Sequence, residues 1–265
     1  MIDNFEFKDR YNIDDLLHIM RCLRDPGGCP WDREQTHESI KKNLIEETYE
    51  VIEAINKQDK ELLLEELGDL LLQVVFHTEM ETEKGGFTFD DVCNGVCQKL
   101  VERHPHVFGT VQADNAEEAL SSWDAVKRQK KGQKKGSVPM LTIPRELPAL
   151  MRADKVQTKA KKVGFDWPDV AGALDKLEEE TAELKEAIAA EKPEDISMEL
   201  GDLLFSAVNV SRFVGCDAEE ALTASTDKFI ARFQKLEALA AERGIDLETA
   251  SLSEMDKLWD EIKTK

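Results

Sequence analysis

The sequence is poor in cysteine and aromatic residues, and it lacks any long hydrophobic run. Only 6% of its 265 residues are aromatic, and its five cysteines form no Cys-x-x-Cys pair. An odd number without such pairs excludes a disulfide framework or a zinc ribbon and suits a reducing compartment. No stretch of about 18 apolar residues occurs, and residues 1–10 lack the apolar segment of a secretion signal. We therefore expect a soluble cytoplasmic protein without membrane contacts.

Positive charge is also scarce. The formal net charge is −20, from 35 Lys and Arg against 55 Asp and Glu. Binding to nucleic acid backbones or anionic membranes needs a basic surface, so both functions are excluded as a general activity. The sequence has neither a glycine-rich phosphate-binding loop ending in Gly-Lys nor a Gly-x-Ser-x-Gly elbow, which excludes P-loop nucleotidases and serine hydrolases of that type.

The chain repeats itself. The letters Glu-Leu-Gly-Asp-Leu-Leu occur at residues 66–71 and again at residues 199–204, and an acidic cluster lies nineteen residues before each copy. The clusters comprise Glu46, Glu47 and Glu50 in the first half and Glu179, Glu180 and Glu183 in the second. Residues three apart share a helix face, so Glu66 with Asp69 and Glu199 with Asp202 each form a carboxylate pair. Identical spacing in both copies indicates two similar modules.

The apolar spacing predicts helices throughout and no strands. We expect helices near residues 13–23, 36–56, 61–81, 89–103, 116–128, 170–190, 193–210 and 218–243, a last short helix that contains Trp259 and Asp260, and a loop at residues 29–32. The helix at 61–81 is apolar on nearly all sides, which predicts burial in a bundle. The fold class is thus all-α with two tandem helical-bundle modules, at residues 1–126 and 150–265. A basic linker rich in Pro and Gly joins them at residues 127–149.

Carboxylates that converge from two helices repel one another unless a cation neutralises them. These clusters offer only oxygen ligands, which suits Mg²⁺, with Mn²⁺ as a substitute, and the Glu-x-x-His pairs of a di-iron bundle do not occur at them. Mg²⁺ commonly keeps sites for substrate phosphates, so a polyphosphate ligand follows. The chemistry implied is hydrolysis of a phosphoanhydride, in which a carboxylate takes a proton from water and cations stabilise the leaving pyrophosphate.

Two further features recur in the same order. Lys99 and Arg103 follow the first carboxylate pair, and Lys228 and Arg232 follow the second; each basic pair is four residues apart. They can contact phosphates or form surface salt bridges within a helix. Trp123 and Trp259 come later, as stacking partners for a base or as core anchors. A Glu-rich helix is also commonly a solvated face, but the apolar runs around these pairs leave little room for one.

The motifs resemble the MazG family of nucleoside triphosphate pyrophosphohydrolases. The resemblance rests on residues 25–32, 46–50, 103–108 and 164–167 and on both Glu-Leu-Gly-Asp-Leu-Leu runs. It implies two tandem MazG modules in a homodimer that hydrolyses NTPs or dNTPs with Mg²⁺. The implied metal ligands are Glu47, Glu50, Glu66, Asp69, Glu180, Glu183, Glu199 and Asp202, the last four being catalytic together with Glu179. The implied nucleotide contacts are Lys176, Leu177, Glu178, Glu179, Lys228, Arg232 and Trp259, with Glu46, Lys99, Arg103 and Trp123 as their candidates in the first copy.

By this resemblance the second half is expected to be catalytic, because Lys176, the basic pair and Trp259 occur together there. Residues 195–198 depart from tandem relatives that carry a Lys just before the second pair. We expect broad base specificity. The alternatives are a narrower hydrolase of dUTP or modified dNTPs, and a module that binds Mg²⁺ and nucleotide without turnover.

Overall fold

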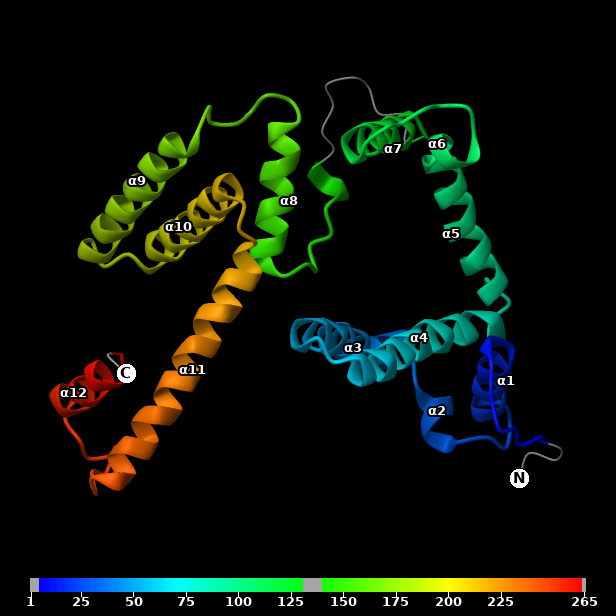
Figure 1. The fold of residues 1–265 in the computed structure, drawn as a ribbon, viewed down its shortest axis with the longest axis horizontal. Helices are drawn as coiled ribbons and strands as arrows, with labels where there is room; N and C mark the ends of the chain where they lie inside the picture. Colours follow the sequence, from blue (N-terminus) through cyan, green and yellow to red (C-terminus); the bar gives the residue numbers. More distant parts are fainter. Residues whose placement is uncertain (1–4, 131–139, 264–265) are drawn as a thin grey trace. The chain divides into compact units, whose positions relative to one another are not determined.

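The computed structural model describes residues 5–130 and 140–263, and within these ranges the chain is helical and contains no strand (Figure 1). The all-α prediction is therefore confirmed. The chain divides into two compact units, Met1–Gln133 and Lys134–Lys265. None of the described helices is long and apolar enough to span a membrane.

The first unit is built on a pair of long helices, α3 and α4, which form its most extensive contact. Its helices are α1 (Ile13–Arg24), α2 (Pro30–Glu34), α3 (His37–Lys57), α4 (Lys60–Glu83), α5 (Phe89–Arg103), α6 (Pro105–Phe108) and α7 (Ala116–Lys130). Thr36 caps α3, as an N-terminal Thr is suited to do. Gln58 ends α3 in the left-handed conformation, with φ of 56°, and Asp59 then caps α4. Two residues thus fix the hairpin.

The core of the first unit lies where α1, α3 and α4 meet. Met20 of α1, Ile40 of α3 and Val75, Phe76 and Met80 of α4 are almost fully buried together. These residues come from the first turns of α3 and the second half of α4, so burial is concentrated at one end of the hairpin. That end holds the two helices in register.

The second unit repeats the hairpin with α9 and α10. Its elements are a 3-10 turn (Met140–Thr142), α8 (Ala149–Lys161), α9 (Val170–Ala189), α10 (Pro193–Val214), α11 (Ala218–Glu242) and α12 (Leu252–Lys263). Pro193 occupies the first turn of α10, where the missing N–H costs nothing. A separate cluster of Leu236, Ala240 and Leu258 joins α11 to α12.

Two expectations about the chain differ from the structure. The predicted loop at residues 29–32 is wrong, because Pro30 begins the short helix α2. Helix α7 continues to Lys130 and so includes the start of the predicted linker, while residues 131–139 lie outside the described residues. The boundaries of the two modules stay a prediction.

The predicted burial of residues 61–81 holds for only half of that helix. Leu64, Leu67 and Leu71 are 77%, 48% and 39% exposed, whereas Val75 and Met80 are buried. The buried core that α1 and α3 form with α4 contains α4 residues from the second half of that helix, Val75, Phe76 and Met80. The apolar face at the start of α4 therefore has no cover within the described part of this unit.

Candidate metal centres

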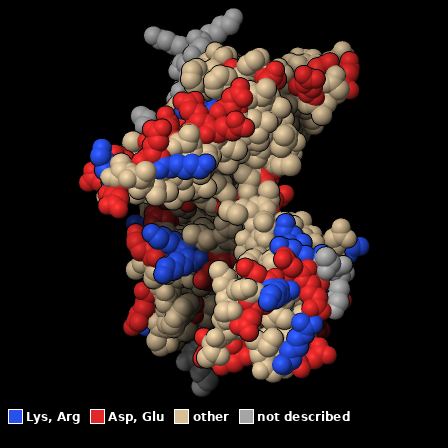
Figure 2. Space-filling model, turned by 90° about the vertical axis from the view of Figure 1, so that its left-hand side faces the viewer, with Lys and Arg blue, Asp and Glu red and all other residues tan. Residues whose placement is uncertain are grey.

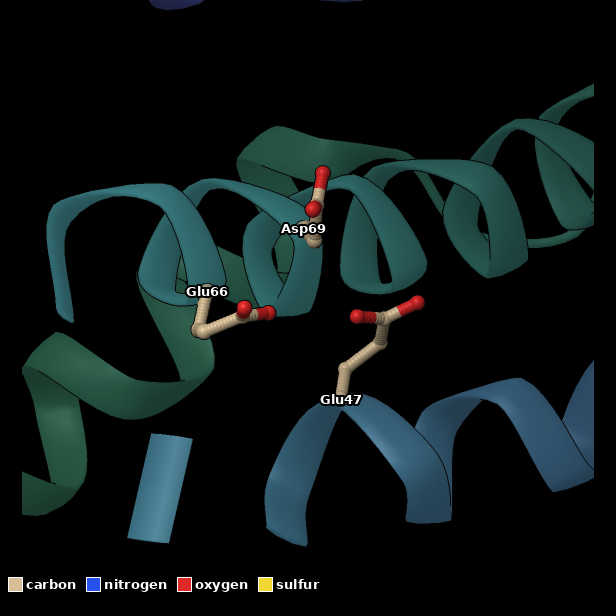
Figure 3. Close-up of side chains that lie close together, drawn as sticks. All are labelled: Glu47, Glu66 and Asp69. Carbon is tan, nitrogen blue, oxygen red and sulfur yellow. The ribbon is translucent and has the colours of Figure 1, made fainter. Parts of the chain in front are cut away.

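The first candidate site lies on the α3–α4 hairpin. Glu47 extends from α3 toward α4, where Glu66 and Asp69 lie about one turn apart (Figure 3). One carboxylate oxygen from each of the three lies within 4.8 Å of the other two. The predicted convergence of these side chains is therefore what the hairpin produces. Glu50 is close enough to Glu47 for its negative charge to help raise the pKa of Glu47.

Burial and mutual repulsion make the first group a poor place for unscreened negative charge. The pKa of Glu47 is raised, first by burial and then by the negative charges of Asp69 and Glu50. The pKa of Glu66 is raised in the same way, by burial and then by Glu50. A shift in this direction means that the ionised form is disfavoured in the bare protein. A cation bound between these carboxylates would offset their mutual repulsion and stabilise their ionised forms.

The second candidate site repeats the geometry on the α9–α10 hairpin. Oxygens of Glu180, Glu199 and Asp202 also lie within 4.8 Å of one another. Glu180 is buried, and Glu183 adjoins it one turn further along α9. The pKa of Glu183 is raised by burial and by the charge of Glu180. The two halves therefore hold the same three-carboxylate arrangement.

Residues 176–179 precede Glu180 on α9, and their side chains differ in exposure and in their contacts. The ammonium of Lys176 lies 2.6 Å from Oε1 of Glu180 and 3.1 Å from Oε1 of Glu179. Glu178 and Glu179 are exposed on α9, while Leu177 is half-buried and its carbonyl accepts a hydrogen bond from the hydroxyl of Thr181. In the first half, Glu46 is exposed beside the half-buried Glu47.

The two predicted Lys/Arg pairs and both tryptophans lie on helices outside the two hairpins that carry the acidic groups. In the first unit the guanidinium of Arg103 lies 5.1 Å and the ammonium of Lys127 4.5 Å from the ring centre of Trp123, while Lys99 is exposed on α5. In the second unit Trp259 of α12 packs against Phe229 of α11, with ring centres 5.2 Å apart.

Lys228 is exposed and Arg232 half-buried, both on α11. The ring contacts of both tryptophans thus involve α5, α7, α11 and α12, not the hairpins that carry the acidic groups. The described contacts within each unit do not join the pairs Lys99/Arg103 and Lys228/Arg232 to the carboxylates; Lys176 alone of the predicted basic residues contacts them.

Two interactions near the hairpins escaped prediction. Nδ1 of His37 lies 2.7 Å from Nδ1 of His77, and Nε2 of His37 lies 2.7 Å from Oε1 of Glu81. In the second unit Arg212 of α10 binds both carboxylate oxygens of Asp166, which lies in the loop before α9. The second pair had a partial signal, because Asp166 belongs to one of the stretches that carry the family resemblance. The first had none.

The ligand atoms that both groups offer are carboxylate oxygens, carried on helices. Such a donor set fits a hard divalent cation and not zinc or copper, which favour nitrogen or sulfur. The free cysteines and the histidine pair lie elsewhere. Each group is therefore an arrangement of carboxylates that can hold a metal ion and leave part of its coordination shell for another ligand.

Comparison with known proteins agrees with this geometry. The model of the MazG nucleotide pyrophosphohydrolase domain matches the chain twice, at residues 35–108 and 169–237, which include both hairpins. The chain belongs to the MazG family. The MazG nucleoside triphosphate pyrophosphohydrolase/pyrophosphatase of Thermotoga maritima is 47% identical to it over 251 residues, which is 95% of each chain.

Two other relatives match almost the same length of this chain. The nucleoside triphosphate pyrophosphohydrolase of Escherichia coli K12 is 43% identical over 256 residues, or 95% of this chain and 97% of the relative. The uncharacterized protein YabN of Bacillus subtilis is 46% identical over 92% of this chain, which corresponds to 50% of YabN. The tandem MazG organisation inferred from the repeat is thus confirmed.

Proposed function

We propose that this MazG chain is a nucleoside triphosphate pyrophosphohydrolase that converts NTPs and dNTPs to monophosphates and pyrophosphate. The proposal is carried by one observation: each MazG match contains a helical hairpin in which three carboxylates face one another. The relatives from Thermotoga maritima and Escherichia coli bear the name of this activity. The formal net charge of −20 agrees with a small metal-screened substrate and not with a nucleic acid. On the face that Figure 2 shows, Asp and Glu side chains lie among those of Lys and Arg.

We further propose Mg²⁺ as the cofactor, with Mn²⁺ as a substitute. Glu180, Glu183, Glu199 and Asp202 would hold it in the second module, and Glu47, Glu50, Glu66 and Asp69 in the first. Bound there, the ion would supply positive charge that screens the carboxylates and the substrate phosphates and acidifies water. The raised pKa values of Glu47, Glu66 and Glu183 agree with this assignment, because burial and neighbouring carboxylates disfavour ionised forms that a bound cation would stabilise.

The protein side chains then have distinct tasks. Water attacks phosphorus at the α-β anhydride, the bond to the bridging oxygen breaks and pyrophosphate leaves. A carboxylate of the catalytic set accepts the proton of the attacking water. Glu179, Glu180, Glu183, Glu199 and Asp202 make up this set in our proposal. The buried position of Glu180 limits its access to bulk water and strengthens its electrostatic interactions.

The substrate contacts are proposed at residues 176–179, Lys228, Arg232 and Trp259. Stacking on Trp259 is compatible with broad base specificity, since every base offers a π-face. Because Lys228, Arg232 and Trp259 lie on α11 and α12 and not on the hairpin that carries the carboxylates, we propose that a homodimer completes the site. The exposed apolar side chains of the hairpins and of α11, including Leu64, Leu204 and Phe229, are suited to such an interface.

The reducing cytoplasm is the proposed location, and the five free thiols agree with it. Light scattering tests the dimer: the purified chain should have twice the mass of 30.0 kDa. A monomer at micromolar concentration would contradict it.

Product analysis of two matched variants tests the activity. Glu47→Gln and Glu180→Gln remove the same charge from equivalent positions of the two modules. We expect AMP and pyrophosphate from ATP and Mg²⁺, with turnover lost at least a hundredfold in Glu180→Gln and retained in Glu47→Gln. Loss in Glu47→Gln alone would place catalysis in the first module. Tight nucleotide binding without products in the wild-type protein would replace the enzyme by a nucleotide-binding module.

A further inference from the structure

The two acidic groups differ in one neighbouring residue. Four positions before Glu180 lies Lys176, whereas four positions before Glu47 lies Asn43. Residues four apart on a helix are neighbours, so each side chain stands beside its group. In the second module the ammonium of Lys176 takes Glu180 as its partner, with Nζ 2.6 Å from Oε1. In the first module the corresponding side chain is a neutral amide.

This difference changes the charge balance of the bare sites. Among the described residues, no Lys or Arg nitrogen lies within ion-pair distance of the carboxylates of the first group, and Glu47 and Glu66 carry the raised pKa values noted above. In the second group Lys176 adds one positive charge next to a Glu180 side chain that is only 7% exposed. The pKa of Lys176 is raised, chiefly by its hydrogen bonds to Glu180 and Glu179. The second group is thus partly neutralised without an ion.

The same contact obstructs a metal ion. Oε1 of Glu180 accepts a charge-assisted hydrogen bond from Lys176, which leaves only the other carboxylate oxygen of Glu180 open to an ion. The ammonium must withdraw before that oxygen is available, and repulsion between the ammonium and a divalent cation acts in the same direction. Withdrawal is sterically open, because the Lys176 side chain is 35% exposed and has a flexible stem.

We propose that Lys176 is a tethered cation that stabilises the metal-free second site, weakens its affinity for a divalent ion and leaves Glu180 when an anionic ligand arrives. Lys176 is then a positioning residue that couples metal binding to polyphosphate binding in the second module, and Asn43 leaves the first module without this coupling. The inference rests on the proposed metal sites but does not require hydrolysis.

Mn²⁺ binding, measured by the electron paramagnetic resonance signal of the free ion, tests this without any turnover. Glu47→Gln serves as the background that weakens the first site. In this background, Lys176→Asn should bind Mn²⁺ about tenfold more tightly, because the hydrogen bond from Lys176 to Glu180 no longer competes with the ion. A hydrogen bond to a charged group contributes about 1.5 kcal/mol, which corresponds to that change in affinity. Lys176→Arg keeps the charge and should leave the affinity nearly unchanged.

The reciprocal exchange provides the matched control. In a Glu180→Gln background, Asn43→Lys should weaken Mn²⁺ binding at the first site about tenfold. Adding α,β-methylene ATP should raise the Mn²⁺ affinity of the second site more in the wild-type Lys176 protein than in Lys176→Asn, after correction for Mn²⁺ bound by the nucleotide. Circular dichroism checks that each variant is folded.

Equal Mn²⁺ affinities in Lys176→Asn and its parent would overturn the proposal, as would tighter binding in Asn43→Lys. An absence of Mn²⁺ binding at the second site in every variant would overturn it as well. These outcomes are separate from the proposed function. A chain that shows the expected shifts but yields no pyrophosphate would retain the tethered cation and lose the hydrolase assignment, and the reverse result would retain the hydrolase and remove the tethered cation.

Discussion

Replacing Asp166 by Asn should destabilise the hairpin that carries the second acidic group. Asp166 lies before α9, and both its oxygens bind Arg212 on α10, one of them 2.9 Å from Nη1. The pair therefore links the chain before one helix of the hairpin to the other helix. Its side chains are 9% and 14% exposed. Loss of one partner from a buried ion pair costs about 3–5 kcal/mol of stability. Because this pair is slightly exposed, we expect the free energy of unfolding to fall by about 3 kcal/mol.

The cause of that loss is the guanidinium left behind. In Asp166→Asn, Arg212 keeps a hydrogen bond to Asn209, 2.7 Å away, but no counter-charge. Adding Arg212→Met to this variant removes the stranded charge and should restore at least half of the lost free energy of unfolding. The exposed pair of Arg243 and Glu261 is the matched control, and Glu261→Gln should cost less than about 1 kcal/mol.

Hydrogen exchange resolved by mass spectrometry is the suitable assay, because a chain of two units need not unfold in one step. Peptides from residues 164–214 report the opening free energy of the hairpin. The pair also holds the pKa of Asp166 below its ordinary value of 3.8, so its stabilisation is present above that pH and is lost as the pH falls through the lower folded pKa. Equal losses in Asp166→Asn and Glu261→Gln, or no recovery in the double variant, would refute the reasoning.

Three further changes test the rest of the account. Gly172→Ala places a Cβ 2.8 Å from Cε3 of Trp167, so it should lower the free energy of unfolding by about 1–2 kcal/mol and shift the tryptophan emission. Gly95→Ala is the control, because the space around Gly95 is open, and it should be neutral or stabilising. Equal effects of the two variants would contradict the contact with Trp167. Burial lowers the pKa of His77 below its ordinary value of 6.5, so the folded first unit resists protonation of this side chain. Urea titrations should therefore show a loss of stability as the pH falls below 6.5. An identical loss in His77→Gln would exclude His77 as the cause. Asp59→Ala removes the cap of α4 and should cost about 1 kcal/mol by hydrogen exchange of residues 60–83; an unchanged value would show that the cap is dispensable.

Local signals predicted most of the fold and the acidic groups. Thr36 and Pro193 mark helix starts in the sequence, and both act as such in the structure. The carboxylate pairs were readable because the spacing of Glu66 and Asp69 is set by the helix alone. Consecutive helices joined by a short turn usually pack side by side, and this alone brings Glu47 to Glu66 and Asp69.

Contacts between distant residues were beyond that reasoning. His37 and His77 are forty residues apart, and Asp166 and Arg212 forty-six, and nothing in the local pattern pairs them. The exposure of Leu64 was also missed, since apolar periodicity states that a face will be covered but not whether the same chain covers it. Lys176 was readable as a neighbour of Glu180, but its choice of partner depends on the side-chain conformation.

The central claim is that paired carboxylate groups on helical hairpins serve hydrolysis of the α-β phosphoanhydride. Phosphorus NMR of the wild-type chain with ATP and Mg²⁺ tests it most directly, because it follows every phosphorus atom at once. We expect AMP and pyrophosphate in equal amounts, and no reaction when a chelator removes the metal. Release of orthophosphate with ADP, or ATP left intact beside an active positive control, would contradict it.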